Sequence, residues 1–261
     1  MTSLSENRAI ILAAGRGSRM GAATAARPKC LNAVAGQPLL HWQLNALRQA
    51  GLDQIAIVRG YLAEMLQRSD CTLFENRRWA ETNMVMTLCC ADEWLRRATC
   101  VISYADILYH ADHVRSLATA PGDLVITYDR LWQDLWSERF ENPLADAETF
   151  RCDSDGVLQE IGRRASSLKE IEGQYMGLFK VTPAGWQQIR RTLDGLSQAE
   201  RDRLDMTTLL SRLLSSGARI DTVPVEGRWC EVDSDADRAL YETRLQDGKP
   251  WRHDWRRAAA A

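Results

Sequence analysis

Residues 9–21, Ala-Ile-Ile-Leu-Ala-Ala-Gly-Arg-Gly-Ser-Arg-Met-Gly, decide the fold, because an apolar run passes directly into a loop of glycines and arginines. The run 9–13 predicts a strand that is buried on both faces of a parallel sheet. Cations gather after it, since Arg16 and Arg19 lie in the loop and Lys29 follows in Arg27-Pro28-Lys29-Cys30-Leu31-Asn32. Glycines and cations together after a strand favour a loop that binds a triphosphate.

The spacing of the glycines separates this loop from the common nucleotide-binding motifs. Gly15, Gly17 and Gly21 lack a Cβ atom, so the backbone can adopt positive φ and approach a ligand closely. Their spacing, G-x-G-x-x-x-G, is one residue off the dinucleotide fingerprint, and no Gly-Lys-Ser/Thr is present as a P-loop requires. Both motifs are therefore disfavoured, and an ordinary exit from a strand is the simpler alternative.

Strand and helix patterns alternate after the loop. Apolar residues recur at helical spacing over 39–50, and 55–58 is the next apolar run. A strand, a helix and a strand in close succession imply a right-handed crossover. We therefore expect an α/β, Rossmann-like fold with a mixed, mainly parallel sheet flanked by helices. Residues 84–97 are expected to form one helix and 101–108 one strand.

The length of 261 residues fits a single large domain, which we expect over residues 1–248. Residues 129–176 are expected to form a small β excursion on the acceptor side, because aromatic and charged residues mix there without a clean period before a hairpin pattern. The basic residues 249–261 are expected to be a tail, either a flexible end or in part residues added by cloning.

Composition narrows the class of partners. The net charge of −2 predicts no interaction with nucleic acid or membrane. Seven cysteines without metal-ligand spacing indicate reduced thiols. No apolar leader or spanning segment is evident, so we expect a cytoplasmic protein.

The segment Leu12-Ala13-Ala14-Gly15-x-Gly17-x-Arg19-Met20, followed by Arg27-Pro28-Lys29-Cys30-Leu31, resembles the signature loop of the nucleotidyltransferases that make sugar and choline nucleotides. Within that family the chain is most similar to the phosphocholine cytidylyltransferase-like branch. The resemblance implies a fold of the nucleotide-diphospho-sugar transferase type, in which the loop wraps the base and the triphosphate and Lys29 contacts phosphate. The nucleotide-binding residues that it implies are Leu12, Ala13, Ala14, Gly15, Arg16, Gly17, Arg19, Asn83 and Tyr104.

Two aspartates match the positions at which the family holds a divalent cation. Asp106 lies near the carboxyl end of the strand expected at 101–108, in Tyr104-Ala105-Asp106, where relatives more often have glycine before the aspartate, and Asp233 lies in Glu231-Val232-Asp233-Ser234. The resemblance implies that both bind Mg²⁺, which takes few protein carboxylates and keeps phosphate oxygens and waters. A solvated strand end is the alternative for Asp106, and a helix N-cap is the alternative for Asp233. Glu231 is either a further ligand near the metal or acceptor, or a surface carboxylate.

Asn83, in Glu81-Thr82-Asn83-Met84, stands where relatives carry an asparagine-rich segment near the nucleotide. A helix N-cap explains it equally well.

The acceptor side is less defined. Arg163, favoured over Arg164, resembles a basic residue that relatives place against the acceptor phosphate, and an arginine fork suits that role. The segment 172–177 resembles the strand entry on the acceptor side, although a plain strand boundary is equally possible. A trimethylammonium group would need an aromatic cage with a carboxylate nearby. The acceptor-binding candidates are Arg163, Glu172, Gln174, Tyr175, Trp132, Trp136 and Trp229.

The function that the resemblance implies is cytidylyl transfer. An acceptor phosphate or phosphonate oxygen attacks the α-phosphorus of CTP and releases pyrophosphate, with Arg16, Lys29 and Arg163 as catalytic residues. The alternatives are a phosphonate cytidylyltransferase, a sugar-1-phosphate uridylyl- or thymidylyltransferase and, from another class, a non-catalytic nucleotide-binding module. The expected partners are CTP and a small phosphorylated acceptor, and a homodimer is possible.

Overall fold

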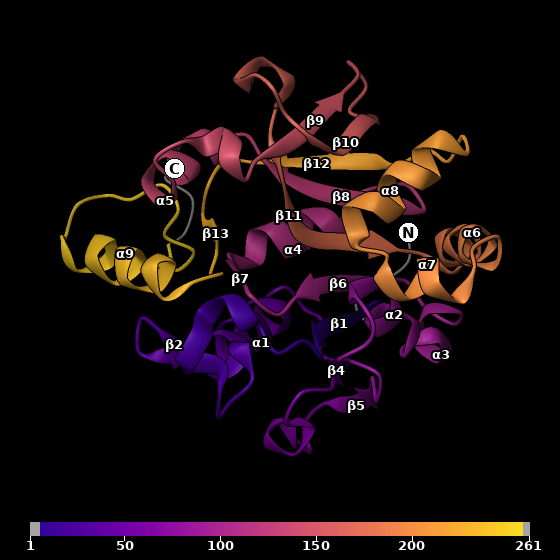
Figure 1. The fold of residues 1–261 in the computed structure, drawn as a ribbon, viewed down its shortest axis with the longest axis horizontal. Coiled ribbons are helices and arrows are strands. Elements are labelled where there is room, and N and C mark those ends of the chain that lie inside the picture. Colours follow the sequence, from indigo (N-terminus) through magenta and orange to yellow (C-terminus); the bar gives the residue numbers. More distant parts are fainter. Residues whose placement is uncertain (1–5, 258–261) are drawn as a thin grey trace.

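A seven-stranded sheet forms the centre of the molecule (Figure 1). The computed structural model describes residues 6–257, without the side chains of residues 19, 22 and 23. The order β12-β8-β11-β6-β1-β4-β5 is parallel throughout, except that β11 runs antiparallel to both β6 and β8. The expected mixed, mainly parallel sheet is thus confirmed. The strands are β1 (Arg8–Ala13), β4 (Ile55–Arg59), β5 (Thr72–Glu75), β6 (Cys100–Tyr104), β8 (Leu124–Asp129), β11 (Gln174–Val181) and β12 (Asp221–Val225).

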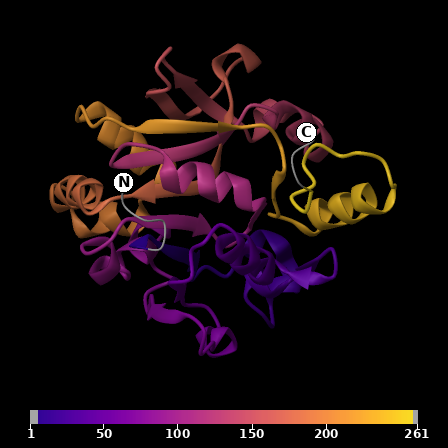
Figure 2. The same cartoon turned by 180° about the vertical axis from the view of Figure 1, so that it is seen from behind.

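Helices cover both faces of this sheet. One face carries α1 (Leu39–Gln49) and α4 (Ala111–Thr119), which Figure 2 shows from behind. The other face carries α2 (Met84–Cys89), α3 (Asp92–Leu95), α6 (Pro183–Asp194) and α8 (Met206–Ser215), with α7 (Gln198–Arg203) beside α2. Two more helices, α5 (Trp132–Arg139) and α9 (Asp235–Gln246), lie against each other at one end.

Strand β1 joins these two layers. Ala9 and Ile11 belong to the core under α1 and α4, whereas Ile10 and Leu12 belong to the core under α2, α6 and α8. None of the four is more than 6% exposed. Since side chains alternate across a strand, the apolar run follows from burial on both faces, as the sequence predicts.

Two expected elements are divided in the structure. The single helix over 84–97 is wrong, because α2 ends at Cys89 and α3 begins at Asp92. The single strand over 101–108 is also wrong, because a turn at 105–106 separates β6 from β7 (Ile107–Tyr109). Strand β7 leaves the sheet to pair with β13 (Trp229–Glu231).

The excursion contains the helix α5 and an antiparallel hairpin of β9 (Glu148–Cys152) and β10 (Leu158–Arg164), which stands beyond β8 and β12 in Figure 1. The sequence pattern did not reveal α5, since its apolar residues have no clear helical period. Short elements complete the chain: β2 (Ala33–Val34), β3 (Gln37–Pro38) and 3₁₀ turns at Ser18–Thr24, Lys29–Leu31, Ala63–Leu66, Pro143–Ala145 and Leu168–Glu170.

The described part of the C-terminal tail is packed, unlike the flexible end expected from composition. His253 and Trp255 are 1% and 3% exposed. The backbone carbonyl of Arg252 accepts a hydrogen bond from the Arg228 amide at 2.7 Å, and His253 Nδ1 lies 3.1 Å from the carbonyl of Trp229. This segment therefore supports the strand that leads to Asp233.

Candidate active site

The signature loop begins at the carboxyl end of β1, beside the end of β6. Leu12 is in register with Tyr104, so the loop after β1 and the turn that carries Asp106 emerge side by side. This edge is where open α/β sheets bind ligands.

Gly17 fits the loop around the stem of Lys29. It has a φ of +73°, and a Cβ atom at this position would lie 2.7 Å from Cδ of Lys29. The Gly17 carbonyl also accepts hydrogen bonds from the Met20 amide at 3.0 Å and from Thr24 Oγ1 at 3.1 Å. Positive φ is thus confirmed at Gly17 and at Gly21, which has a φ of +53°, but not at Gly15.

Lys29 reaches across the site to two aspartates. Its Nζ atom lies 2.8 Å from Oδ2 of Asp106 and 2.7 Å from Oδ1 of Asp233, and the residue is only 8% exposed. Burial alone would lower the pKa of Lys29, but the charges and hydrogen bonds of the two aspartates hold it above its ordinary value. The sequence predicted all three residues and their shared edge, but not their direct contact.

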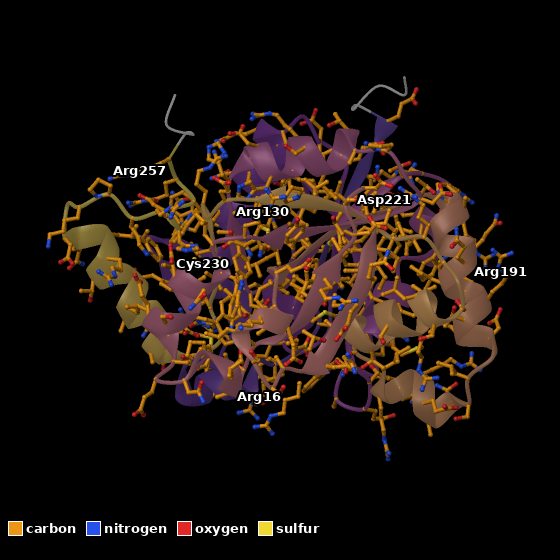
Figure 3. The ribbon with its side chains drawn as sticks, turned by 90° about the horizontal axis from the view of Figure 1, so that it is seen from above. Arg16, Arg130, Arg191, Asp221, Cys230 and Arg257 are labelled. Atoms are coloured by element: carbon orange, nitrogen blue, oxygen red, sulfur yellow. The ribbon has the colours of Figure 1, made fainter. Side chains whose placement is uncertain are left out.

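Of the two other predicted cations in the loop, only Arg16 has a side chain that the structure describes. Arg16 is exposed, its guanidinium carbon lies 5.7 Å from the ring centroid of Tyr61, and it points outward at the edge of the molecule (Figure 3). The side chain of Arg19 lies outside the described part of the structure.

A cavity of about 140 Å³ opens between the signature loop and the turn that follows β6. We call it the nucleotide cavity; it is lined by Leu12, Ala13, Gly15, Gly17, Lys29, Cys30, Met84, Ala105 and Asp106. Of the other predicted nucleotide residues, Ala14 is buried next to it, and its carbonyl accepts the amide of Tyr61 at 2.9 Å. Asn83 is the N-cap of α2, since its Oδ1 accepts the Met84 amide at 2.7 Å.

Three carboxylates converge beside Lys29. Asp106, Glu231 and Asp233 each place one oxygen within 4.8 Å of the others. The pairing of β7 with β13 causes this, because it sets Glu231 opposite Ile107 and directs the Val232 amide to the Asp106 carbonyl at 2.8 Å. Burial, and then the charge of Asp233, raise the pKa of Glu231 above its ordinary value. Ser234, not Asp233, caps α9, so the N-cap alternative for Asp233 is excluded.

Arg139 is a buried cation that the sequence did not reveal. Its side chain is 1% exposed, and it contacts Glu231 at 3.2 Å, Asp233 at 3.7 Å and Asp237 at 2.9 Å. Oδ2 of Asp237 in turn accepts the amides of Asp233 and Ser234, both at 2.9 Å. Arg139 therefore connects α5 to the carboxylates at the start of α9. Its only sequence signal is the spacing to Trp136, which places the two side chains on one face of a helix.

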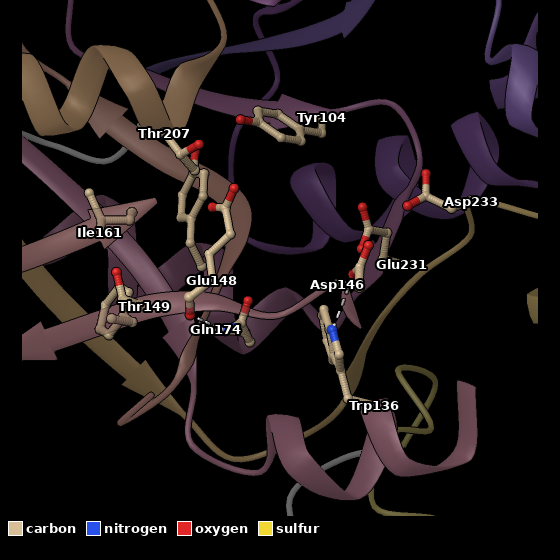
Figure 4. A pocket seen from close by; sticks show the side chains of 12 residues that line it. Tyr104, Trp136, Asp146, Glu148, Thr149, Ile161, Gln174, Thr207, Glu231 and Asp233 are labelled. Atoms are coloured by element: carbon tan, nitrogen blue, oxygen red, sulfur yellow. Dashed lines mark hydrogen bonds between the residues drawn. The ribbon is translucent and has the colours of Figure 1, made fainter. Parts of the chain in front are cut away.

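A second cavity, of about 190 Å³, lies between β11, the hairpin and Glu231, as Figure 4 shows. We call it the acceptor cavity; it is lined by Tyr104, Trp136, Asp146, Glu148, Thr149, Phe150, Ile161, Gln174, Tyr175, Thr207, Glu231 and Asp233. Trp136, Gln174 and Tyr175 are thus brought together as the sequence analysis expected. Tyr104, expected at the nucleotide, lines this cavity and not the nucleotide cavity.

The remaining acceptor candidates do not line the acceptor cavity. The Arg163 side chain is 71% exposed and pairs with Glu160. Glu172 is exposed and accepts the Cys152 amide at 2.9 Å. Trp132 and Trp229 are buried behind Trp136, on which Trp229 stacks with ring centroids 5.9 Å apart. Sequence reasoning missed six residues that line the cavity and that no motif marks: Asp146, Glu148, Thr149, Phe150, Ile161 and Thr207.

Comparisons with known proteins show which sequences and structures this chain is similar to. A family model described as a MobA-like NTP transferase domain matches residues 9–165. The chain is 36% identical to the CTP:phosphoglutamine cytidylyltransferase of Campylobacter jejuni, over 86% of this chain and 95% of that protein. It is 33% identical to the 2-aminoethylphosphonate cytidylyltransferase of Lancefieldella rimae, over only 42% and 46% of the two chains.

A solved structure is similar over nearly the whole chain. The CTP:phosphocholine cytidylyltransferase of Streptococcus pneumoniae superposes with a TM-score of 0.70 at 20% identity, covering 92% of this chain and 99% of that one. This likeness confirms the expected fold type. In the described part of the chain, no helix is long and apolar enough to cross a membrane.

Proposed function

Because the chain belongs to the MobA-like NTP transferase family, we propose that it transfers CMP from CTP to a small acceptor that carries a phosphate or phosphonate group, with release of pyrophosphate. The relative that matches nearly the full length is named as a cytidylyltransferase for phosphoglutamine, and a partial match is named for 2-aminoethylphosphonate. Both names describe a cytidylyltransferase with a small phosphorus-containing acceptor. They support the same class of reaction here.

One observation carries the proposal: Lys29, Asp106 and Asp233 join the two cavities. Lys29 and Asp106 line the nucleotide cavity, and Asp233 lines the acceptor cavity. The Lys29 ammonium bonds to both aspartates. The phosphates of the nucleotide and the phosphorus group of the acceptor would therefore meet at this cluster. Positioning and charge neutralisation there would supply the catalysis.

The carboxylate cluster fits a divalent cation, which we propose to be Mg²⁺ held by Asp106 and Asp233. The fit rests on two observations: Oδ1 of Asp106 is buried with no hydrogen-bond partner among the described residues, and the Lys29 ammonium already occupies a cation position between the aspartates. Hard oxygen ligands of this kind suit Mg²⁺. When bound, the metal would neutralise the charge of the triphosphate and polarise its oxygens.

We assign the nucleotide to the signature loop. Backbone groups of Leu12, Ala13, Ala14 and Gly15 would face the base, and Gly17 lets the loop close over Lys29. Lys29 would stabilise charge on the α-phosphate and on the departing pyrophosphate. Arg16 is left out of this assignment, because its side chain is exposed and points outward. Asn83 would contribute indirectly, because it caps α2 and thereby positions Met84, which lines the nucleotide cavity.

The proposed chemical step needs no covalent intermediate. An acceptor oxygen that is already ionised attacks the α-phosphorus, a new O–P bond forms, and the bond from that phosphorus to the bridging oxygen of pyrophosphate breaks. Because the nucleophile is charged, the step requires no general base. Trp136, Gln174 and Tyr175 would position the acceptor. Arg163 is left out of the proposed site because of its exposure.

The test is pyrophosphate release with CTP, UTP, dTTP and ATP, each combined with phosphoglutamine, 2-aminoethylphosphonate, phosphocholine and glucose 1-phosphate. We expect turnover with CTP and one of the first three acceptors. Turnover only with UTP or dTTP and glucose 1-phosphate would contradict cytidylyl transfer. Binding of CTP without pyrophosphate from any acceptor would instead favour the non-catalytic module.

A further inference from the structure

The charges that line the acceptor cavity have one sign. Four of its residues are carboxylates, and none of the residues that line it is a lysine, arginine or histidine. Two of the carboxylates, Glu231 and Asp233, have cations beside them in Arg139 and Lys29. Among residues 6–257, neither Asp146 nor Glu148 makes an ion pair. The cavity therefore carries negative charge that the protein leaves without a counter-charge.

The positions of these two carboxylates differ. Glu148 is half-buried on β9, next to Thr207. Asp146 is exposed and accepts a hydrogen bond from Trp136 Nε1 at 3.2 Å. Figure 4 shows both side chains in the cavity. A cationic group of the acceptor would offset both charges, and the half-buried Glu148 would contribute more because it is less screened by water.

Each of the four aromatic rings that line the cavity packs against another aromatic ring, and Tyr104 and Tyr175 meet edge to face with ring centroids 5.9 Å apart. Trp136 stacks on Trp229 and lies 5.0 Å from the Arg139 guanidinium. Phe150 stacks on Tyr128 with ring centroids 4.7 Å apart. A trimethylammonium group binds through open aromatic faces and has no N–H to donate. A primary ammonium group has three N–H donors, which match carboxylate oxygens.

From this arrangement we propose that the acceptor is a phosphorylated or phosphonylated primary amine, whose ammonium group binds Glu148 and Asp146 while its phosphorus group lies at Asp233. The inference rests on the proposed function and narrows its acceptor class. It also predicts that N-methylation of the same amine weakens binding, because each methyl group removes a hydrogen-bond donor.

The decisive comparison uses acceptor pairs that differ at the amino group. Phosphoethanolamine is compared with phosphocholine, and phosphoglutamine with its analogue that lacks the α-amino group, by kcat/KM for pyrophosphate release with CTP. We expect the primary amine of at least one pair to be favoured by about 100-fold, a ratio within the range that unpaired buried polar groups impose. Equal use of both members of each pair, or preference for the member without N–H groups, would overturn the inference.

Variants locate the effect in the cavity. E148Q should raise the KM for the preferred amine by about 10- to 100-fold, and D146N by less, while the affinity for CTP stays within about twofold. D155N is the matched control, because Asp155 is an exposed carboxylate in the turn of the same hairpin and lies outside the cavity. Equal responses of E148Q and D155N would contradict the assignment.

The comparison of acceptors requires no variant, so it decides the question even if E148Q does not fold. Its outcome is also separable from the proposed function. Absence of pyrophosphate with every acceptor contradicts the proposed function, whereas turnover with indifference to the amine contradicts the present inference alone.

Discussion

The Nζ atom of Lys29 lies 2.7 Å from Oδ1 of Asp233, although the two residues are 204 positions apart in the chain. The contact joins the signature loop to the segment between β13 and α9, and thus the first motif of the chain to its last. It also places a single cation between the nucleotide cavity and the acceptor cavity. Several experiments can test what this cation does.

Replacement of Lys29 should affect chemistry more than nucleotide binding. We expect K29M to lower kcat by about 10²- to 10³-fold, the usual cost of losing one group that stabilises charge in the transition state. The affinity for CTP, measured by calorimetry, should change much less. K169M removes an exposed lysine from the loop before β11 and serves as the control. A K29M enzyme with normal kcat would contradict the role given to Lys29.

The metal assignment is tested by binding as well as by activity. D106N should weaken the binding of Mn²⁺, used as a probe in electron paramagnetic resonance, and should raise the metal concentration needed for half-maximal turnover. Asparagine keeps the size of the side chain but removes the charge that a hard cation prefers. D112N, at a carboxylate that pairs with Arg228 outside the cluster, provides the comparison. Unchanged metal binding in D106N would show that the ion lies elsewhere.

Arg139 should be important for stability, since it is a buried partner of several carboxylates. R139M is expected to lower the free energy of unfolding by about 3–5 kcal/mol, because Glu231 and Asp237 would be left without their counter-charge. R244M should cost no more than about 1 kcal/mol, since the Arg244 side chain is 40% exposed in its pair with Glu138. Urea unfolding of the two variants measures the difference. Similar losses in both would mean that the Arg139 contacts contribute no more than a surface pair.

The sequence predicted the elements that depend on local pattern. The buried strand at 9–13, the glycine loop and the mainly parallel sheet follow from periodicity and from residues without a Cβ atom, and the structure confirms them. The family comparison likewise confirms the resemblance of the loop to the nucleotidyltransferases. The proximity of Asp106 and Asp233 was also predictable, but only because the family places both at one site.

Contacts made by tertiary structure were not predictable. Helix α5 has no clear apolar face, so neither its existence nor the burial of Arg139 could be inferred from periodicity. Asp146 and Glu148 enter the acceptor cavity only because the hairpin folds over the sheet edge. Arg163 and Glu172 lie outside the acceptor cavity, since Arg163 pairs with Glu160 and Glu172 accepts the Cys152 amide. The tail residues 250–257 look basic and loose in sequence, yet His253 and Trp255 are buried in the structure.

Gly15 and Gly17 have different backbone conformations, so substitution by alanine should affect them differently. At Gly17, alanine would be strained at a φ of +73° and would collide with Cδ of Lys29. We expect G17A to lose about 1–2 kcal/mol of stability and most of its turnover, because Lys29 would have to move. Gly15 lacks positive φ, and a Cβ atom there would meet no atom within 4 Å, so G15A should fold with normal stability. Thermal unfolding and kcat of both variants provide the measurement, and equal stability losses would contradict this account.

Buried histidines should make the fold sensitive to acid. Burial lowers the pKa of His253 to about 4 and that of His113 to about 3, so both stay neutral in the folded protein while the unfolded chain binds protons below its ordinary pKa of about 6.5. Each histidine therefore reduces the free energy of unfolding by about 1.4 kcal/mol per pH unit as the pH falls from about 6.5 to its folded pKa.

Asp129 acts in the opposite direction. Its carboxylate lies 3.6 Å from His253, and burial raises its pKa to about 6, so between pH 6 and 4 the folded protein holds a proton that the unfolded chain lacks. Together the three groups leave a net loss of stability on acidification of about 1.4 kcal/mol per pH unit in this window, since two slopes of one sign meet one of the other.

H253N tests this balance, because the asparagine amide can still donate to the Trp229 carbonyl that lies 3.1 Å from Nδ1 of His253. Removal of one titrating histidine should reduce the slope by about 1.4 kcal/mol per pH unit between pH 6 and 4.5, as measured by urea unfolding at a series of pH values. H41N, at an exposed histidine of α1, should leave the slope unchanged. An H253N variant whose stability still falls as steeply as that of the wild type would show that His253 is protonated in the folded protein, and that the buried tail does not keep it neutral.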